Sequence, residues 1–161
     1  EGGHIEFAAR NAFEHALYER LKESHGYVSV ELMCSGSGMD AVYKATCEVT
    51  GQKHEPLSPG HILENAQNGS EPELTFCQFR ADAIMTAAGD LALANGARGG
   101  VVLVGGVTNR IRSYLKTDRA ITRFQNRGPM SSYLENCPVK LLENPHAPLI
   151  GAAAFCLETK R

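Results

Sequence analysis

Hydrophobic and polar residues follow each other in the first part of the chain with the spacing of an amphipathic helix. Asn11 is a good N-cap, and Phe13, Leu17 and Leu21 share one face while charged side chains occupy the other. Gly26 stands where glycine commonly ends a helix. The pattern predicts a helix that begins after Asn11 and ends at about Gly26.

A glycine-rich turn at residues 34–38, C-S-G-S-G, opens a second predicted helix, which ends near Gly51. Residues 52–70 contain several Pro and Gly breaks, so they are typical of a connecting loop, with one short helix after Ser58. A turn of this kind presents backbone N–H groups at a helix start, which makes it an element that ligand sites favour.

A long helix is predicted after this loop. Ser70 and Glu73 have the spacing of a capping box, and Pro72 lies in the first turn. Hydrophobic and small residues then recur at helical spacing to about Asn95. The small residues indicate that the helix packs closely on a sheet.

Three segments predict extended structure. Residues 28–32 are rich in β-branched side chains, residues 138–142 are largely apolar, and residues 101–104 form a continuous apolar run. Such a run, V-V-L-V, is typical of a strand buried on both faces of a parallel sheet. The other segments predict two short helices over residues 109–116 and 118–125 and a packed helix over residues 149–157. This alternation indicates an α/β layered domain.

The composition is that of one globular domain. The chain has 161 residues, of which 43% are hydrophobic and 21% are charged, so it is too apolar for a disordered segment and long enough to bury one core. A net charge of -2 argues against nucleic acid or an anionic membrane as a partner. No apolar run approaches the roughly 20 residues needed to span a bilayer.

The chain has five cysteines, an odd number without a C-x-x-C pair. This pattern fits reduced thiols in a cytosol. The wide spacing of the cysteines argues against a structural zinc ion, and we predict no metal-binding residues.

Two glycine motifs could contact a ligand. Gly105 and Gly106 follow the apolar run, and ligands of open α/β sheets bind beyond the carboxyl ends of strands; the alternative is a turn that needs a positive φ. The S-G-S-G turn suits an anion, but Asp40 in its first helical turn would repel a phosphate, so a wall against a ribose or base fits better. A capping turn of Ser37 with Asp40 is the structural alternative.

Three side chains could bind a sugar. Glu1 and His4 flank two glycines, and Glu31 supplies a second carboxylate at the end of an apolar segment. Ionised carboxylates accept hydrogen bonds from hydroxyls, and His can donate or accept, so these groups suit vicinal sugar hydroxyls. Taken alone, they fit a solvated turn and a surface carboxylate better, since Glu is rarely buried.

Longer motifs occur together in order along nearly the whole chain. They are E-G-G-H-I-E-F-A at 1–8, H-G-Y-V-S-V-E at 25–31, S-G-S-G-M at 35–39, D-L-A-L-A-N-G-A-R-G-G-V at 90–101, V-G-G-V at 104–107 and P-V-K-L-L-E-N-P-H-A-P-L-I-G-A-A-A at 138–154. With these motifs the chain closely resembles the C-terminal lobe of bacterial-type ATP-dependent glucokinases, in the hexokinase and actin-like ATPase superfamily. Ser37 and Pro148 differ from the residues common in that family at their turns.

The resemblance implies that residues 1–161 form the C-terminal, larger lobe of an α/β, actin-like (ribonuclease H-like) sugar kinase, a layered sheet with flanking helices. The implied contacts are Glu1, His4 and Glu31 for the glucose hydroxyls, and Gly36, Gly38, Gly105 and Gly106 for the adenosine end of ATP. The implied reaction transfers the γ-phosphoryl of ATP, with Mg²⁺, to the 6-hydroxyl of glucose, in a cytoplasmic homodimer.

In the family that the chain resembles, the general-base Asp and the glycine-rich phosphate loops belong to the N-terminal lobe. Because the chain begins with Glu1 rather than Met, we expect that lobe to be absent from it. We therefore predict no catalytic residue among these positions and no activity from the chain alone. The alternatives are a noncatalytic sugar- or nucleotide-binding module of the same superfamily, or a kinase for another hexose.

Overall fold

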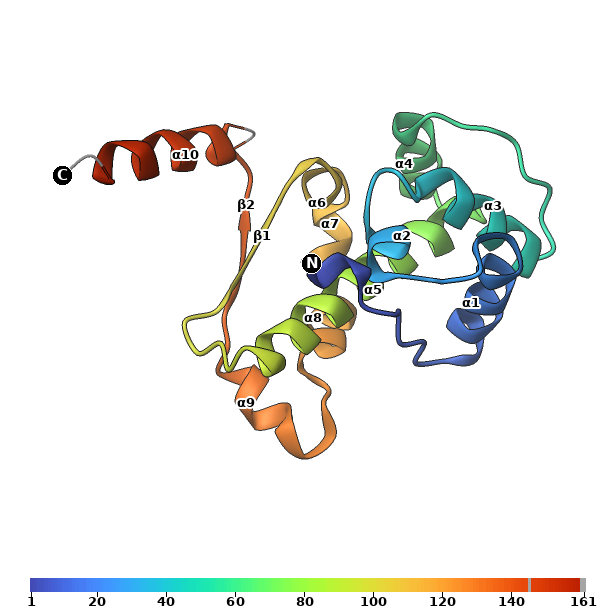
Figure 1. Cartoon of the computed structure of the whole chain (residues 1–161). Helices are drawn as coiled ribbons and strands as arrows, with labels where there is room; N and C mark the ends of the chain where they lie inside the picture. The colour runs from blue at the N-terminus through green and yellow to red at the C-terminus, as the bar shows by residue number, and fades with distance from the viewer. Residues whose placement is uncertain (145, 160–161) are drawn as a thin grey trace.

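The long helix α5 (Glu73–Ala94) runs through the middle of the fold, and other helices pack around it (Figure 1). The computed structural model describes residues 1–144 and 146–159. The helices before α5 are η1 (Gly2–His4), α1 (Ala12–His25), α2 (Val30–Cys34), α3 (Met39–Val49) and α4 (Pro59–Gln67). The helices after it are α6 (Gly106–Arg110), α7 (Arg112–Leu115), α8 (Asp118–Gln125), η2 (Gly128–Met130), α9 (Ser131–Glu135) and α10 (Ala147–Glu158). Helix α5 packs against α2, α3, α4, α7, α8 and α9. It contributes buried side chains to both hydrophobic clusters of the core.

Helix α1 begins and ends where the sequence predicts. The Asn11 side chain accepts a hydrogen bond from the Glu14 backbone N–H at 2.9 Å, and Gly26 is the C-cap. Leu17 and Leu21 are buried, and α1 packs against α3. The predicted helices after the glycine-rich turn and after Ser58 are likewise confirmed as α3 and α4.

Residues 30–34 form helix α2, although the β-branched side chains of residues 28–32 predict a strand. The Ser29 Oγ accepts a hydrogen bond from the Leu32 backbone N–H at 3.1 Å and caps the helix. Ser29 also pairs with Glu6 in an isolated antiparallel bridge, so extended structure ends at this residue. The strand prediction was wrong because a cap, rather than side-chain propensity, decides the local structure.

Helix α5 has the predicted span but not the predicted cap. Pro72 is the N-cap and makes no side-chain capping bond, and it is the Glu71 carboxylate that accepts a hydrogen bond from the Thr75 backbone N–H, at 3.1 Å. The buried Glu73 carboxylate instead accepts a hydrogen bond from the Tyr43 hydroxyl of α3 at 2.8 Å. The capping box of Ser70 with Glu73 is therefore wrong, because Glu73 joins two helices.

Strands β1 (Val101–Val104) and β2 (Val139–Leu142) pair in parallel, which confirms both predicted strands. Among the described residues they make a two-stranded sheet. One face packs on the α5 side of the core, while Val102 and Val104 on the other face are 58% and 46% exposed. The expectation that β1 is buried on both faces is wrong for the described chain.

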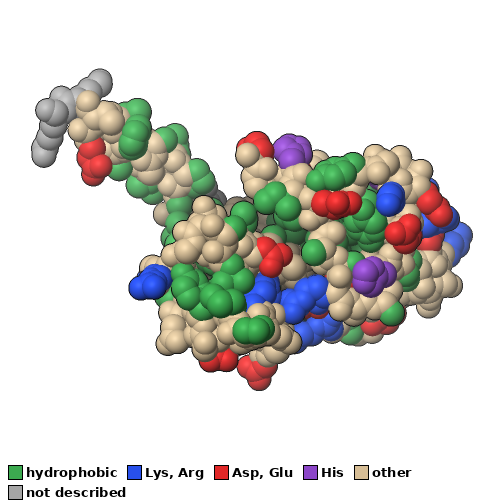
Figure 2. Space-filling view, turned by 60° about the horizontal axis from the view of Figure 1, so that its bottom comes forward, with side chains coloured by type: hydrophobic (Ala, Val, Ile, Leu, Met, Phe, Trp, Pro, Cys, Tyr) green, Lys and Arg blue, Asp and Glu red, His purple; other side chains and the backbone are tan. Residues whose placement is uncertain are grey.

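Helix α10 stands away from the other helices at the end of β2 (Figure 1). Figure 2 shows it as a projecting arm with hydrophobic side chains along its surface. Leu149, Phe155 and Leu157 are 71%, 66% and 70% exposed, so the prediction of a packed helix is wrong within the described residues. None of the described helices has the length and apolar character needed to cross a bilayer.

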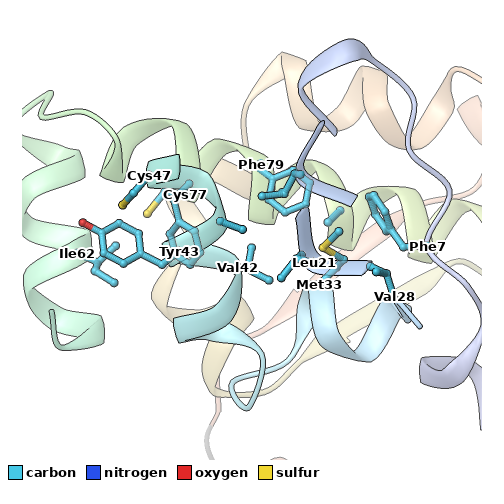
Figure 3. Close-up of a cluster of buried hydrophobic side chains, with 14 of the residues drawn as sticks. Phe7, Leu21, Val28, Met33, Val42, Tyr43, Cys47, Ile62, Cys77 and Phe79 are labelled. Atoms are coloured by element: carbon cyan, nitrogen blue, oxygen red, sulfur yellow. The ribbon is translucent and has the colours of Figure 1, made fainter. Parts of the chain in front are cut away.

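The core beside α1, α2 and α3 fixes the segment that carries Glu31. Figure 3 shows this cluster, in which Phe79 of α5 lies near Phe7, their ring centroids 6.0 Å apart in an edge-to-face arrangement. Val28 and Met33 are fully buried in the same cluster, on either side of Glu31 in the sequence. The backbone of the Glu31 segment is therefore held by apolar packing at both ends.

Candidate functional site

The E-G-G-H motif and Glu31 lie side by side. The Ile5 carbonyl oxygen accepts a hydrogen bond from the Val30 backbone N–H at 2.8 Å, and this pairing brings η1 against the start of α2. A Cβ at Gly3 would lie only 3.0 Å from Glu31 Oε2, so glycine at this position leaves room for the carboxylate. The structure thus brings together two motifs that are distant in sequence.

The polar side chains of this corner are free to bind a ligand. Glu1, His4 and Glu31 are all exposed, and the side-chain hydrogen bonds of the described residues include none from these three. The backbone of the motif is nevertheless fixed, since the Tyr27 hydroxyl donates to the His4 carbonyl oxygen at 2.8 Å. A held backbone with unbonded carboxylate and imidazole groups suits hydroxyl recognition.

The two glycine motifs also meet. A Cβ at Gly36 would lie 4.0 Å from Val107 Cγ2, so the S-G-S-G turn faces the first turn of α6. A hollow of about 100 Å³ lies between these segments. It is lined largely by apolar side chains together with two arginines, and its lining includes Gly36, Met39, Phe76, Arg80, Val107 and Arg110.

The four glycines proposed for the nucleotide have different structural reasons to be glycine. Gly105 has φ of 124°, which other residues rarely adopt. Gly38 packs so closely on α2 that a Cβ would come within 1.9 Å of the Leu32 carbonyl oxygen. Neither reason applies at Gly36 or Gly106, and a Cβ at Gly106 would meet no atom within 4 Å. The surface at Gly106 is therefore open to a ligand.

The structural alternative for the S-G-S-G turn does not form. Gly38 is the N-cap of α3, without a side-chain capping bond, and the Ser37 hydroxyl lies 2.7 Å from that of Ser35. Asp40 faces His54, whose Nε2 is 3.7 Å from the Asp40 carboxylate. The capping turn of Ser37 with Asp40 is therefore wrong.

Arg80 is a residue of this region that sequence reasoning missed. Its side chain comes from the middle of α5 and is 2% exposed. It lines the hollow beside Gly36 and donates hydrogen bonds to the backbone at the end of α2. The available signal was an arginine on the apolar face of a long helix, next to Phe79.

The described residues contain no group of three or more His, Cys, Asp or Glu side chains that could hold a metal ion. Burial raises the pKa of the Cys34 thiol to about 12 and that of the Cys77 thiol to about 11. Both thiols are therefore protonated near neutral pH. The chemistry that this surface offers is hydrogen bonding and shape rather than nucleophilic attack.

Comparisons with known proteins identify the family of the chain. A sequence model of the family described as Glucokinase matches residues 1–159. The chain is 36% identical over 160 residues to a glucokinase of Saccharophagus degradans, covering 96% of this chain and 49% of the relative. It is 39% identical over 154 residues to a glucokinase of Caulobacter sp. strain K31, covering 95% of this chain and 46% of the relative. The chain thus spans about half the length of these relatives.

Solved structures show the same fold. The crystal structure of a glucokinase from an Antarctic psychrotroph matches with a TM-score of 0.89 and 39% identity, over 99% of this chain and 49% of that one. A glucokinase from Balamuthia mandrillaris, solved in complex with glucose, matches with a TM-score of 0.76 at 21% identity over 90% of this chain and 43% of that one, a likeness of fold alone. The expected α/β sugar-kinase fold is confirmed, and the chain belongs to the glucokinase family.

Proposed function

We propose that this chain is the C-terminal lobe of an ATP-dependent glucokinase and supplies contacts to glucose and to the adenosine end of ATP. The adjacency of the E-G-G-H motif to Glu31 carries the proposal, because it sets two carboxylates and an imidazole at one exposed corner. Glu1, His4 and Glu31 would accept or donate hydrogen bonds at the sugar hydroxyls.

The nucleotide would lie across the open glycines of the two glycine motifs. Gly36 and Gly106 leave space above the backbone, and the hollow beside them is largely apolar, which suits the face of a base. At about 100 Å³ the hollow is smaller than a nucleoside, so the ligand would extend from it over the glycines.

These residues would act by positioning. Phosphoryl transfer depends chiefly on orienting the reactants and stabilising charge, so a fixed sugar places its 6-hydroxyl in line with the γ-phosphorus. The general base, an Asp, and the phosphate loops would come from the part of the family's length that this chain does not cover. Mg²⁺ would arrive bound to the ATP phosphates as part of that substrate.

The direct test is ADP formation by the full-length enzyme with glucose, other hexoses and no sugar. We expect glucose-dependent ADP formation, with glucose preferred over its epimers. Glucose binding in a titration without ADP formation would instead favour a noncatalytic sugar-binding module, and faster turnover of another hexose would change the substrate. Either result would overturn the proposal.

We also propose that the protein acts in the cytoplasm as a homodimer. The five cysteines are all free thiols in the structure, which suits a reducing compartment. The dimer rests on the family resemblance alone. Light scattering of the full-length enzyme tests it, and a monomeric mass at micromolar concentration would contradict it.

A further inference from the structure

A single buried arginine binds the end of helix α2. Arg80 Nη1 donates to the Met33 carbonyl oxygen, and Nη2 donates to those of Cys34 and Ser35, each at 2.8 Å. The last carbonyl groups of a helix have no partner within the helix, so these bonds complete α2 at its C-terminal end. The positive charge is also favourable beside that end of the helix dipole.

The charge of Arg80 is compensated by these carbonyl groups. Among residues 1–144 and 146–159, no carboxylate lies within ion-pair distance of Arg80. The neighbouring thiols of Cys34 and Cys77 stay protonated, as their raised pKa values require. The other close partner is the Phe76 ring, 5.7 Å from the guanidinium carbon. A buried charge so arranged strongly favours one position of α2 relative to α5.

Helix α2 connects the two halves of the site. Glu31 lies in its first turn, and the Ser35 backbone N–H donates to the Glu31 carbonyl oxygen at 2.8 Å. The S-G-S-G turn follows directly, and Gly38 packs back on the Leu32 carbonyl oxygen. A shift at the Arg80 end of α2 would therefore move both the glucose-facing carboxylate and the nucleotide-facing turn.

We propose that Arg80 is a positioning residue that couples the glucose site to the nucleotide site by fixing helix α2 and the turn that follows it. This inference rests on the function proposed above. Lysine could not replace Arg80 fully, because a single ammonium group cannot match the planar fork that reaches three carbonyl oxygens.

The test compares Arg80→Met and Arg80→Lys with the unmodified full-length enzyme. For Arg80→Met we expect the glucose KM and the ATP KM each to rise roughly tenfold, which corresponds to the loss of about one charge-assisted hydrogen bond. We also expect kcat to fall. Arg80→Lys should recover part of each change. The control is Leu134→Ala on α9, a buried residue that lines neither site, which should lower the melting temperature without raising either KM.

The outcomes separate this proposal from the proposed function. An unmodified enzyme that forms no ADP with glucose contradicts both. An active enzyme in which both Arg80 variants change only one KM, or neither, overturns the coupling alone. If Arg80→Met does not fold, amide hydrogen exchange of the unmodified enzyme decides: glucose should slow exchange at residues 36–38, and unchanged exchange there overturns the coupling.

Discussion

Gly105 and Gly106 are neighbours in the sequence, but only one of them is required by the backbone. The positive φ of Gly105 would strain any other residue, whereas Gly106 lies at the start of α6 with open space around it. The sequence could not assign these roles, because the pair G-G is consistent with either. The structure therefore separates a glycine of the turn from a glycine that a ligand could approach.

This distinction predicts opposite effects for matched substitutions. Gly106→Val should raise the ATP KM more than the glucose KM, because the side chain would occupy the open surface, and it should leave the melting temperature nearly unchanged. Gly105→Val should cost about 1–3 kcal/mol of stability by backbone strain. Both KM values and the melting temperature of each variant check this. A fall in melting temperature for Gly106→Val with an unchanged ratio of KM values would remove Gly106 from the nucleotide site.

Three helices are joined by one buried ion pair. Arg123 of α8 donates to the Glu14 carboxylate of α1 and to the Thr86 hydroxyl of α5, each at 2.7 Å. Glu14 is 1% exposed, and its carboxylate also accepts hydrogen bonds from the Arg10 backbone N–H at 2.7 Å and from the Asn11 side-chain amide at 2.9 Å. Residue spacing along α1 did not predict this ion pair, because Arg123 lies far from Glu14 in the sequence.

Arg123→Met should therefore destabilise the protein by about 3–5 kcal/mol, because it leaves a buried carboxylate without its cation. The matched control is Arg20→Met, which removes an arginine from an exposed pair with Glu48 and should cost much less. Urea denaturation of the full-length enzyme measures both. Equal losses for the two variants would show that burial of Glu14 does not matter.

The elements that sequence reasoning predicted are those decided by local signals. The Asn11 cap, the glycine after α1 and the apolar runs of β1 and β2 were sufficient to locate their elements. Helix α2 was missed although Ser29 supplies a local cap at its start, because the β-branched residues around Ser29 favour a strand. No local signal shows that Arg80 from a distant helix completes the end of α2. The same holds for Glu73, whose partner is Tyr43 on α3 rather than its own helix.

The residues of the candidate site likewise fall into those that sequence motifs indicate and those that only the fold brings together. The family motifs point to Glu1, His4, Glu31 and the glycines as candidates, because these residues stand in the short motifs at 1–8, 25–31, 35–39 and 104–107. Arg80 and Arg110 belong to none of these motifs and line the hollow only through folding. Contacts between distant segments, such as the hydrogen bonds of Arg80 to the end of α2, therefore identify residues near the site that the motifs do not include.

On the scale of the whole molecule, the chain spans about half the length of its relatives. Helix α10 and the outer face of the two-stranded sheet expose large hydrophobic side chains. If the general base and the phosphate loops lie in the part of the relatives that this chain does not cover, as proposed above, the chain alone would bind substrates without completing the reaction, because binding cannot replace those groups.

We therefore predict that residues 1–161 alone form no ADP from ATP in the presence of glucose. The measurement is a coupled ADP assay of the purified chain against a control without protein. The full-length enzyme serves as the positive control under the same conditions. Glucose-dependent ADP formation by the short chain would contradict the division of the site between two lobes.

The central claim, that this chain supplies the glucose contacts, is tested most directly by the glucose KM of the full-length enzyme carrying Glu31→Gln. Replacing a charged acceptor by an amide should cost about 1.5–3 kcal/mol of glucose binding, or roughly a 10- to 150-fold rise in KM. The melting temperature should not change, because Glu31 is exposed and makes no side-chain hydrogen bond among the described residues. Glu19→Gln, an exposed carboxylate on α1, is the matched control and should leave the KM unchanged. A Glu31→Gln enzyme with the glucose KM and kcat of the unmodified protein would contradict the account.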